Sequence, residues 1–311
     1  MPQNKTFFLL IIISLFFSSC IHKIYNIDTN NEQTPVVNCL FTTDSVFTVY
    51  IGLTSNMYNQ IDDSITNPNV KIVSENGDTL YFHKKEAHIF ISDSVAKQGV
   101  NYKLIVETSN YGILTAQSKI PLQSKKIDTA SFFENYFYNP NSNTLFDKIN
   151  LTIKNEVNEV NYYEAVVLSK TEAGTINGIP FDKLYFSENY FTDCPIIEYY
   201  QSDNKTGNSL LFNNLNFTDQ FQEIYFYCTV YNIPEETKYL IINLKQTSVD
   251  YYLYRKSLLL NTIQANNNFS INYILNNTFR EENTEIYSNI TGGLGIFAGY
   301  NCNENYIISI N

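Results

Sequence analysis

Short runs of alternating apolar and polar residues constrain the fold of this chain more than any other feature of its sequence. In the clearest run, Ile224, Phe226 and Cys228 alternate with Tyr225 and Tyr227. A spacing of two places these sets on opposite faces of a β-strand. Similar runs recur along the chain between turn-forming residues. The pattern predicts antiparallel sheets with one buried face.

The residue composition favours the same fold class. Aromatic residues make up 15% of the 311 residues, and all of them are Tyr or Phe. Such residues fit a pleated, half-buried surface. Between residues 34 and 122 the runs are closely spaced, and Asn76-Gly77 is a strong hairpin signal. Residues 34–122 are therefore predicted to form an immunoglobulin-like or transthyretin-like β-sandwich.

A helical spacing of apolar residues occurs once with clarity, in the second half of the chain. Val249 and Tyr252 begin this pattern, and either Thr247 or Ser248 is placed to cap the first turn. We therefore expect one α-helix near residues 249–265.

This helix belongs to a second β-rich domain that we assign to residues 125–311. Arg255 and Lys256 lie on the helix and are expected to face solvent. The predicted fold is mostly β, with two β-sandwich-like domains, the second of which carries one α-helix.

Residues 1–19 have the layout of a signal peptide. Lys5 gives a positive start, residues 7–17 are almost entirely apolar, and the small residues Ser18 and Ser19 follow. At about 1.5 Å per residue, the apolar run covers roughly 16 Å, against about 30 Å of bilayer hydrocarbon. The run is therefore too short to span a membrane.

The end of this leader resembles the lipobox of bacterial lipoproteins, because the bulky Phe17 precedes Ser18-Ser19-Cys20. The resemblance implies cleavage before Cys20 and acylation of its sulfur and new amine by chains such as palmitate. Each buried CH₂ group contributes about 0.8 kcal/mol, so several acyl chains would anchor the protein permanently. Residues 20–33 would then form a tether. The alternative is a plain secreted protein in which Cys20 is incidental.

The charge of the chain argues against nucleic acid as a partner. The net charge is −11, and Arg255 and Arg280 are the two arginines. Scarce arginine also weakens any proposal of phosphate binding.

No motif for catalysis, a cofactor or a metal stands out, so we expect a non-enzymatic protein without cofactors. A glycan hydrolase that uses a carboxylate pair is the remaining enzymatic alternative. The spacing of such a pair in space is not visible in a sequence.

A long segment, residues 170–208, is rich in aromatic residues and lacks a strand pattern. Its aromatic side chains could stack on sugar rings or hold an apolar ligand, or they could fill the core beneath the loop. The candidate ligand-binding residues are Tyr185, Phe186, Tyr190, Phe191, Tyr199 and Tyr200.

The cysteines beyond Cys20 fall into two pairs. Cys39 and Cys228 lie within alternating runs and are expected to be buried as small hydrophobic residues. Cys194 and Cys302 lie in loop-like contexts and form a possible disulfide in an exported protein.

A glycine cluster closes the chain at Gly292, Gly293 and Gly295. A phosphate cradle would need a following helix and usually a lysine, and the sequence offers neither. We therefore expect the glycines to permit a close approach of two backbones where a strand enters a sheet. After them we expect a last strand at residues 306–310.

Four features together resemble the Bacteroidota lipoprotein family catalogued as domain of unknown function 4249. They are the lipobox, the early sandwich, the helix start Asp250-Tyr251-Tyr252-Leu253-Tyr254 and the closing motif of Asn289, Ile290, Gly292, Gly293, Gly295 and Phe297. The resemblance implies a lipoprotein of the outer membrane that is often paired with a TonB-dependent transporter. It brings no catalytic residues, and it implies a structural role for the closing motif.

These observations lead us to expect a membrane-anchored accessory lipoprotein without enzymatic activity. It would capture a ligand or dock on a TonB-dependent β-barrel transporter. The alternative is a structural, adhesive or envelope-assembly lipoprotein. The sequence leaves open which side of the outer membrane the protein faces.

Overall fold

The computed structural model describes most of the chain beyond the leader. The described residues are 33–54, 65–122, 127–140, 143–154, 159–179, 209–215, 217, 219–229, 233–267 and 285–310, without the side chains of 139, 209, 226, 229, 259–267 and 302–304. The predicted signal peptide and nearly all of the predicted tether lie outside this set. The domain bounds that we assigned remain a prediction.

Strands dominate the described residues, as predicted. The first group is β1 (Pro35–Phe41), β2 (Val46–Leu53), β3 (Asn69–Ser74), β4 (Thr79–Lys84), β5 (Ile89–Val95), β6 (Asn101–Thr108) and β7 (Gly112–Lys119). The second group is β8 (Ile127–Asn139), β9 (Thr144–Lys154), β10 (Tyr162–Thr171), β11 (Ile176–Gly178), β12 (Ser209–Asn213), β13 (Phe221–Thr229), β14 (Thr237–Thr247) and β15 (Leu294–Ser309). The helix α2 (Val249–Asn267) lies between β14 and β15.

Two sheets contain these strands. The larger follows the order β11-β10-β14-β15-β1-β2-β5-β4-β3-β6-β7, with β12 on β10, and the smaller follows β13-β9-β8. The predicted hairpin at Asn76-Gly77 is confirmed, because β3 and β4 pair across it and Gly77 adopts a φ of 88°. The mostly β fold is therefore confirmed, with sheets arranged like a sandwich.

The strands β1 to β7 enclose one hydrophobic core. Alternate residues of β1 are buried, and Phe41 contacts Phe47 and Tyr102 at centroid distances of 5.0 and 5.9 Å. The aromatic contacts of Phe41 also include Phe297, at 4.7 Å, although Phe297 belongs to the last strand. The last strand, β15, thus contributes a side chain to the core that β1 to β7 form.

A second core lies between the smaller sheet and strands β10, β12 and β14. Ile149, Leu151 and Ile224 face it from the smaller sheet, while Tyr163 and Leu240 are fully buried in it from the larger one. The buried thiols of Cys39 and Cys228 contribute to the first and second core respectively, as predicted.

The helix α2 begins where the sequence predicts it. The hydroxyl oxygen of Ser248 accepts a hydrogen bond from the amide of Tyr251 at 3.3 Å, so Ser248 rather than Thr247 caps the first turn. The acidic Asp250 lies in that turn, where the helix dipole favours a negative charge. Among the described residues, no helix is both long enough and apolar enough to cross a bilayer.

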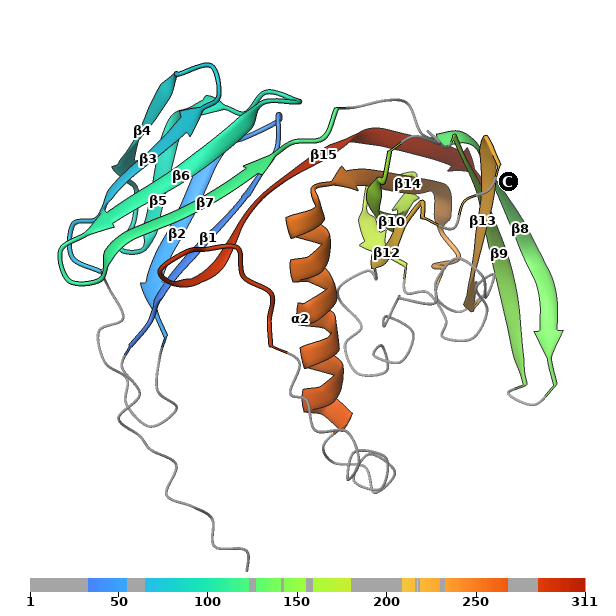
Figure 1. The fold of residues 1–311 in the computed structure, drawn as a ribbon. Helices are drawn as coiled ribbons and strands as arrows, with labels where there is room; N and C mark the ends of the chain where they lie inside the picture. The colour runs from blue at the N-terminus through green and yellow to red at the C-terminus, as the bar shows by residue number, and fades with distance from the viewer. Residues whose placement is uncertain are drawn as a thin grey trace, which may run out of the picture. The chain divides into compact units, whose positions relative to one another are not determined.

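The last strand, β15, is much longer than predicted, because we expected a strand only at residues 306–310. Its first part pairs in parallel with β1, from Leu294 to Gly299, and its second part pairs antiparallel with β14 (Figure 1). Glycine is unfavourable in strands on average, so the sequence pattern did not indicate a strand in the glycine-containing first part of β15.

The glycines of β15 are required by close backbone contacts. A side-chain carbon on Gly293 would lie 2.6 Å from the carbonyl oxygen of Pro35, and one on Gly295 would overlap the carbonyl oxygen of Val37. The side chain of Asn289 bonds both backbone groups of Phe297, donating at 2.8 Å and accepting at 2.9 Å. The closing motif therefore holds the start of β15 against β1.

Replacing Gly295 with alanine should destabilise the protein more than the same change at Gly77. Both glycines have positive φ, so either substitution costs about 1–3 kcal/mol of backbone strain. Only at Gly295 does the added methyl group also meet backbone, since nothing lies within 4 Å of it at Gly77. Urea unfolding should show the larger loss for Gly295→Ala, and equal losses would contradict this account of β15.

Candidate functional site

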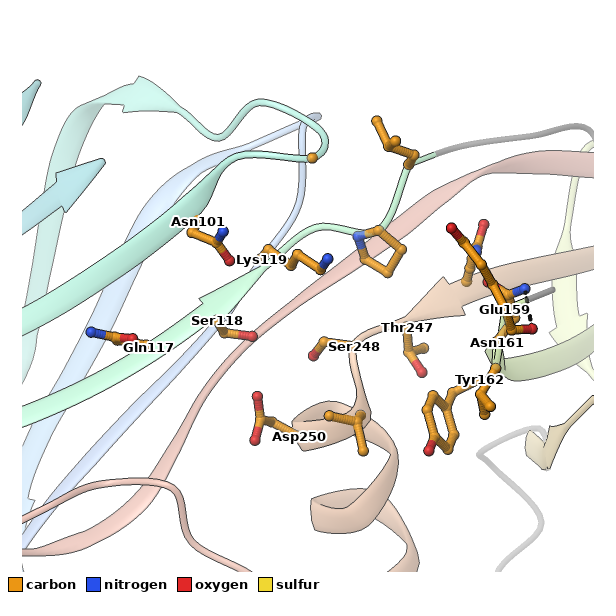
Figure 2. A pocket seen from close by; sticks show the side chains of 16 residues that line it. Asn101, Gln117, Ser118, Lys119, Glu159, Asn161, Tyr162, Thr247, Ser248 and Asp250 are labelled. Carbon is orange, nitrogen blue, oxygen red and sulfur yellow. Dashed lines mark hydrogen bonds between the residues drawn. The ribbon is translucent and has the colours of Figure 1, made fainter. Parts of the chain in front are cut away.

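A cavity of about 910 Å³ opens between the ends of β6 and β7 and the start of α2 (Figure 2). This volume lies within the range of small-molecule sites, about 300–1,000 Å³. Its labelled lining residues are Asn101, Gln117, Ser118, Lys119, Glu159, Asn161, Tyr162, Thr247, Ser248 and Asp250. We treat this cavity as the candidate functional site.

Half of the lining residues carry an amide or hydroxyl group on the side chain. The charged lining residues are Lys119, Glu159 and Asp250, so carboxylates outnumber ammonium groups. The amino end of α2 would favour an anion, but the carboxylate of Asp250 already lies in that first turn. The lining therefore disfavours anionic ligands.

A chain of hydrogen bonds fixes the wall formed by residues 159–161. The amide nitrogen of the Gln246 side chain donates to Asn161 Oδ1 at 2.6 Å, and the Asn161 backbone donates to Asn214 Oδ1 at 2.7 Å. Asn214 in turn donates to the carbonyl of Glu159 at 2.8 Å. Because these side chains are buried, the network gives the wall one defined arrangement.

Unpaired polar atoms gather beside this network. Among the described residues, Gln246 Oε1, Thr247 Oγ1, and both amide atoms of Asn301 are buried without a hydrogen-bond partner. Gln246 and Thr247 line the cavity, and Asn301 lies opposite Gln246 in the β14–β15 register. A buried polar group without a partner costs about 1–3 kcal/mol. The atoms of Gln246 and Thr247 belong to lining residues, which makes them candidates for ligand contact.

A buried charge cluster holds α2 against the sheet next to the cavity. Glu164 on β10 is almost completely buried and lies 2.8 Å from Lys245 Nζ and 3.0 Å from Arg255 Nη2. The hydroxyl of Tyr251 donates to the same carboxylate at 2.6 Å. Our expectation that Arg255 faces solvent is therefore wrong, because a buried carboxylate on another element binds its guanidinium.

The cluster keeps Glu164 ionised despite its burial. Burial by itself would raise the pKa of Glu164, but the charges of Lys245 and Arg255 and the hydrogen bonds from Lys245 and Tyr251 lower it to about 2. Burial and the negative charge of Glu164 in turn raise the pKa of Tyr251. At neutral pH the cluster is therefore a closed ion-pair network that ties α2 to β10 and β14.

Most of the residues that we proposed from sequence lie outside the described part of the chain. These are Cys20, Cys194 and the aromatic set of Tyr185, Phe186, Tyr190, Phe191, Tyr199 and Tyr200, and the side chain of Cys302 is outside it as well. The closing motif is described, and none of its residues lines the cavity.

The sequence analysis missed the polar residues at the cavity. Nothing in the order Lys245-Gln246-Thr247-Ser248 distinguishes it from an ordinary polar end of a strand. In the part of the chain described, no cluster of three or more His, Cys, Asp or Glu side chains could hold a metal ion.

The described residues form a β-rich protein with one described helix and a cavity in whose lining half of the residues carry an amide or hydroxyl group. The chain belongs to the family described as Domain of unknown function (DUF4249), whose model matches residues 22–305. No curated protein matches it.

One similar solved structure is a DUF4785 family protein from Legionella pneumophila, with 9% sequence identity and a TM-score of 0.22. The alignment covers 68% of this chain and 52% of that chain, so it spans about half the length of the solved protein.

Replacing Glu164 with glutamine should lower the free energy of unfolding at neutral pH. It should also make that free energy decline less as the pH becomes acidic. The folded-state pKa of about 2 lies below the ordinary value of 4.5, so the stabilisation is complete above pH 4.5 and is lost as the pH falls toward 2. The shift corresponds to a loss on the order of 3 kcal/mol. Urea unfolding between pH 2.5 and 7 should show a steeper acid decline for the wild type.

Glu107 provides the matched control, because its carboxylate also pairs with a lysine, Lys71, at 2.7 Å but is exposed. Glu107→Gln should change stability little, since exposed ion pairs contribute little. Equal effects of the two substitutions would contradict the role assigned to the buried cluster.

Proposed function

We propose that this protein is a lipid-anchored binding protein without enzymatic activity. It holds a small neutral ligand, rich in hydroxyl or amide groups, in the cavity beside α2. It acts as an accessory to a TonB-dependent transporter in the outer membrane of a Bacteroidota-type cell. The observation that carries the proposal is that two lining residues, Gln246 and Thr247, each have a buried oxygen without a described hydrogen-bond partner.

The chemistry of the lining supports a neutral ligand. Asn101, Gln117 and Asn161 offer amide groups that both donate and accept hydrogen bonds, and no arginine is among the lining residues. A phosphate or carboxylate ligand would meet the carboxylates of Glu159 and Asp250. A ligand with hydroxyl or amide groups would supply partners without introducing charge.

The state of the lining serines supports binding rather than catalysis. Ser118 accepts a hydrogen bond from the backbone amide of Gly299 at 3.4 Å, and Ser248 caps α2. A serine nucleophile needs an adjacent base, and the described lining contains no histidine. These hydroxyl groups are thus engaged in holding the backbone.

The leader and the family support the proposed location. A short apolar run followed by Ser18-Ser19-Cys20 is suited to acylation at the cysteine. The tether of residues 20–33 would let the folded part reach a neighbouring membrane protein. Pairing with a transporter is what the resemblance to outer-membrane lipoproteins implies, and it is part of the proposal.

Replacing Thr247 with valine should weaken ligand binding without reducing stability. Valine keeps the shape of threonine and removes a buried hydroxyl oxygen that lacks a partner, so stability should stay equal or rise by about 1 kcal/mol. Loss of one hydrogen bond should weaken binding about tenfold. Thermal shift and calorimetry with neutral sugars and with dipeptides blocked at both ends would measure both effects.

Thr42 gives a matched control, because its hydroxyl oxygen is also buried without a described partner and it does not line the cavity. Thr42→Val should leave ligand affinity unchanged. A Thr247→Val variant that binds as tightly as the wild type would argue against the cavity as the binding site.

The anchor should depend on Cys20. In cells fed labelled palmitate, the wild type should incorporate the label and fractionate with the outer membrane, whereas Cys20→Ser should do neither. Ser19→Ala keeps a small residue before the cysteine and should behave as the wild type does. Detergent extraction of the anchored protein should recover a TonB-dependent barrel with it.

Two results would contradict this part of the proposal. An unlabelled mature protein with a free amino-terminal thiol would exclude the anchor. Recovery without any barrel protein, together with altered adhesion or envelope integrity after deletion, would favour the structural or adhesive alternative.

A further inference from the structure

The smaller sheet carries a group of aromatic side chains that the cavity does not use. We define the aromatic face as Phe133, Tyr136, Tyr225, Tyr227 and Lys148, which come from β8, β9 and β13 (strands in Figure 1). Consecutive rings lie close together, with centroid distances of 6.1 Å for Phe133–Tyr136, 6.0 Å for Tyr136–Tyr227 and 5.7 Å for Tyr225–Tyr227. Phe133 and Tyr136 are 43% and 49% exposed, so the face is open to a ligand.

A bulge in β8 adds Tyr136 to this face. Phe133 pairs with Lys148 and Phe137 pairs with Phe146, so three residues of β8, 134–136, stand opposite the single residue Asp147. Regular pairing would place one residue there. The extra residues turn the Tyr136 ring toward Phe133 and Tyr227. Bulges are used in this way to redirect side chains next to functional sites.

The bulge is built at a cost to stability. Asn135 adopts a φ of 52°, a left-handed conformation that is uncommon outside glycine and that asparagine tolerates better than most residues. Its amide donates to Asp147 Oδ1 at 2.8 Å, and Asp147 is only 2% exposed. Burial raises the pKa of this carboxyl, which reflects the cost of keeping it there. These unfavourable features position a ring that is half exposed, so core packing does not explain them. They point to a binding function for the Tyr136 ring.

Lys148 determines the chemistry of the face. Its ammonium nitrogen lies 4.6 Å from the centroid of Tyr136, 4.7 Å from that of Tyr225 and 6.0 Å from that of Phe133. These cation–π contacts hold a hydrogen-bond donor among apolar rings. Asn150 follows two residues later on the same face, and its Oδ1 is a buried acceptor without a described partner.

We propose that the aromatic face is a second binding site, which takes pyranose rings of a polysaccharide. A pyranose ring presents C–H groups on its faces and hydroxyl groups around its edge. The rings of Phe133 and Tyr136 match the C–H faces, and the ammonium group of Lys148 matches the hydroxyl groups. A stable protein interface uses about 20–30 residues on each side, many more than this face contains.

This site is independent of the cavity. None of its residues lines the cavity, so the binding of a polysaccharide does not require the function proposed above. Both sites together would let one protein hold a polymer on one surface and a small neutral ligand on another.

Native gels that contain a soluble polysaccharide would test the proposal with the full chain in detergent. Suitable probes are laminarin, arabinoxylan, galactomannan and soluble starch, each in a separate gel. At least one probe should retard the wild type. Tyr136→Ala and Phe133→Ala should each raise the dissociation constant for that probe tenfold or more, and Lys148→Met should also raise it.

Two controls separate binding from folding and from the cavity. Tyr81→Ala removes a tyrosine that is 71% exposed on β4, and it should migrate as the wild type does. Thr247→Val should also leave the retardation unchanged. Tyr136→Ala and Tyr81→Ala should unfold at the same urea concentration. Equal midpoints would show that Tyr136→Ala loses binding without being less stable than the control.

Several outcomes would overturn the proposal. If no probe retards the wild type, the face does not take polysaccharides. If a probe retards Tyr136→Ala and Phe133→Ala as strongly as the wild type, binding occurs elsewhere. Recovery of a protein by the wild type but not by Tyr136→Ala, without retardation by any probe, would assign the face to protein docking instead.

Discussion

The pairing of β15 with strands from opposite ends of the chain is the interaction on which the rest of the structure depends. Residues 294–299 lie parallel to β1, and the same strand continues antiparallel to β14. The backbones come so close that a side-chain carbon at Gly293 or Gly295 would meet carbonyl oxygens of β1. A contact between residues so distant in sequence forms only when both ends of the chain have folded.

Two kinds of buried polar group lie near α2. One kind has hydrogen-bond and ion-pair partners, and the other has none among the described residues. Glu164 is satisfied by Lys245, Arg255 and Tyr251, so it stabilises the position of α2. The atoms at Thr247 and Asn301 are not satisfied by the described residues. Proteins leave few buried polar groups in that state, and those that remain usually need an explanation. Ligand binding beside α2 is the explanation that we favour.

Local signals in the sequence predicted the local structure well. The Asn76-Gly77 hairpin and a helix start at Thr247 or Ser248 follow from preferences within a few residues, and the structure has the hairpin and the cap at Ser248. The extent of β15 was missed, because its glycines are explained by contacts with another strand. Arg255 was assigned to solvent for a similar reason, since its partner Glu164 lies 91 residues away in the chain. The cavity was not predicted for the same reason, because its walls come from four separate segments.

The sequence by itself determined the mostly β class, the single described helix and the burial of Cys39 and Cys228. These depend on alternation, turn residues and capping, whose physical causes act over a few residues. Only the tertiary structure decided which strands neighbour each other, where Glu164 finds its partners, and which polar atoms of Thr247 and Asn301 remain unpaired. Those outcomes depend on distances between residues far apart in the chain, and such distances exist only after the backbone has packed.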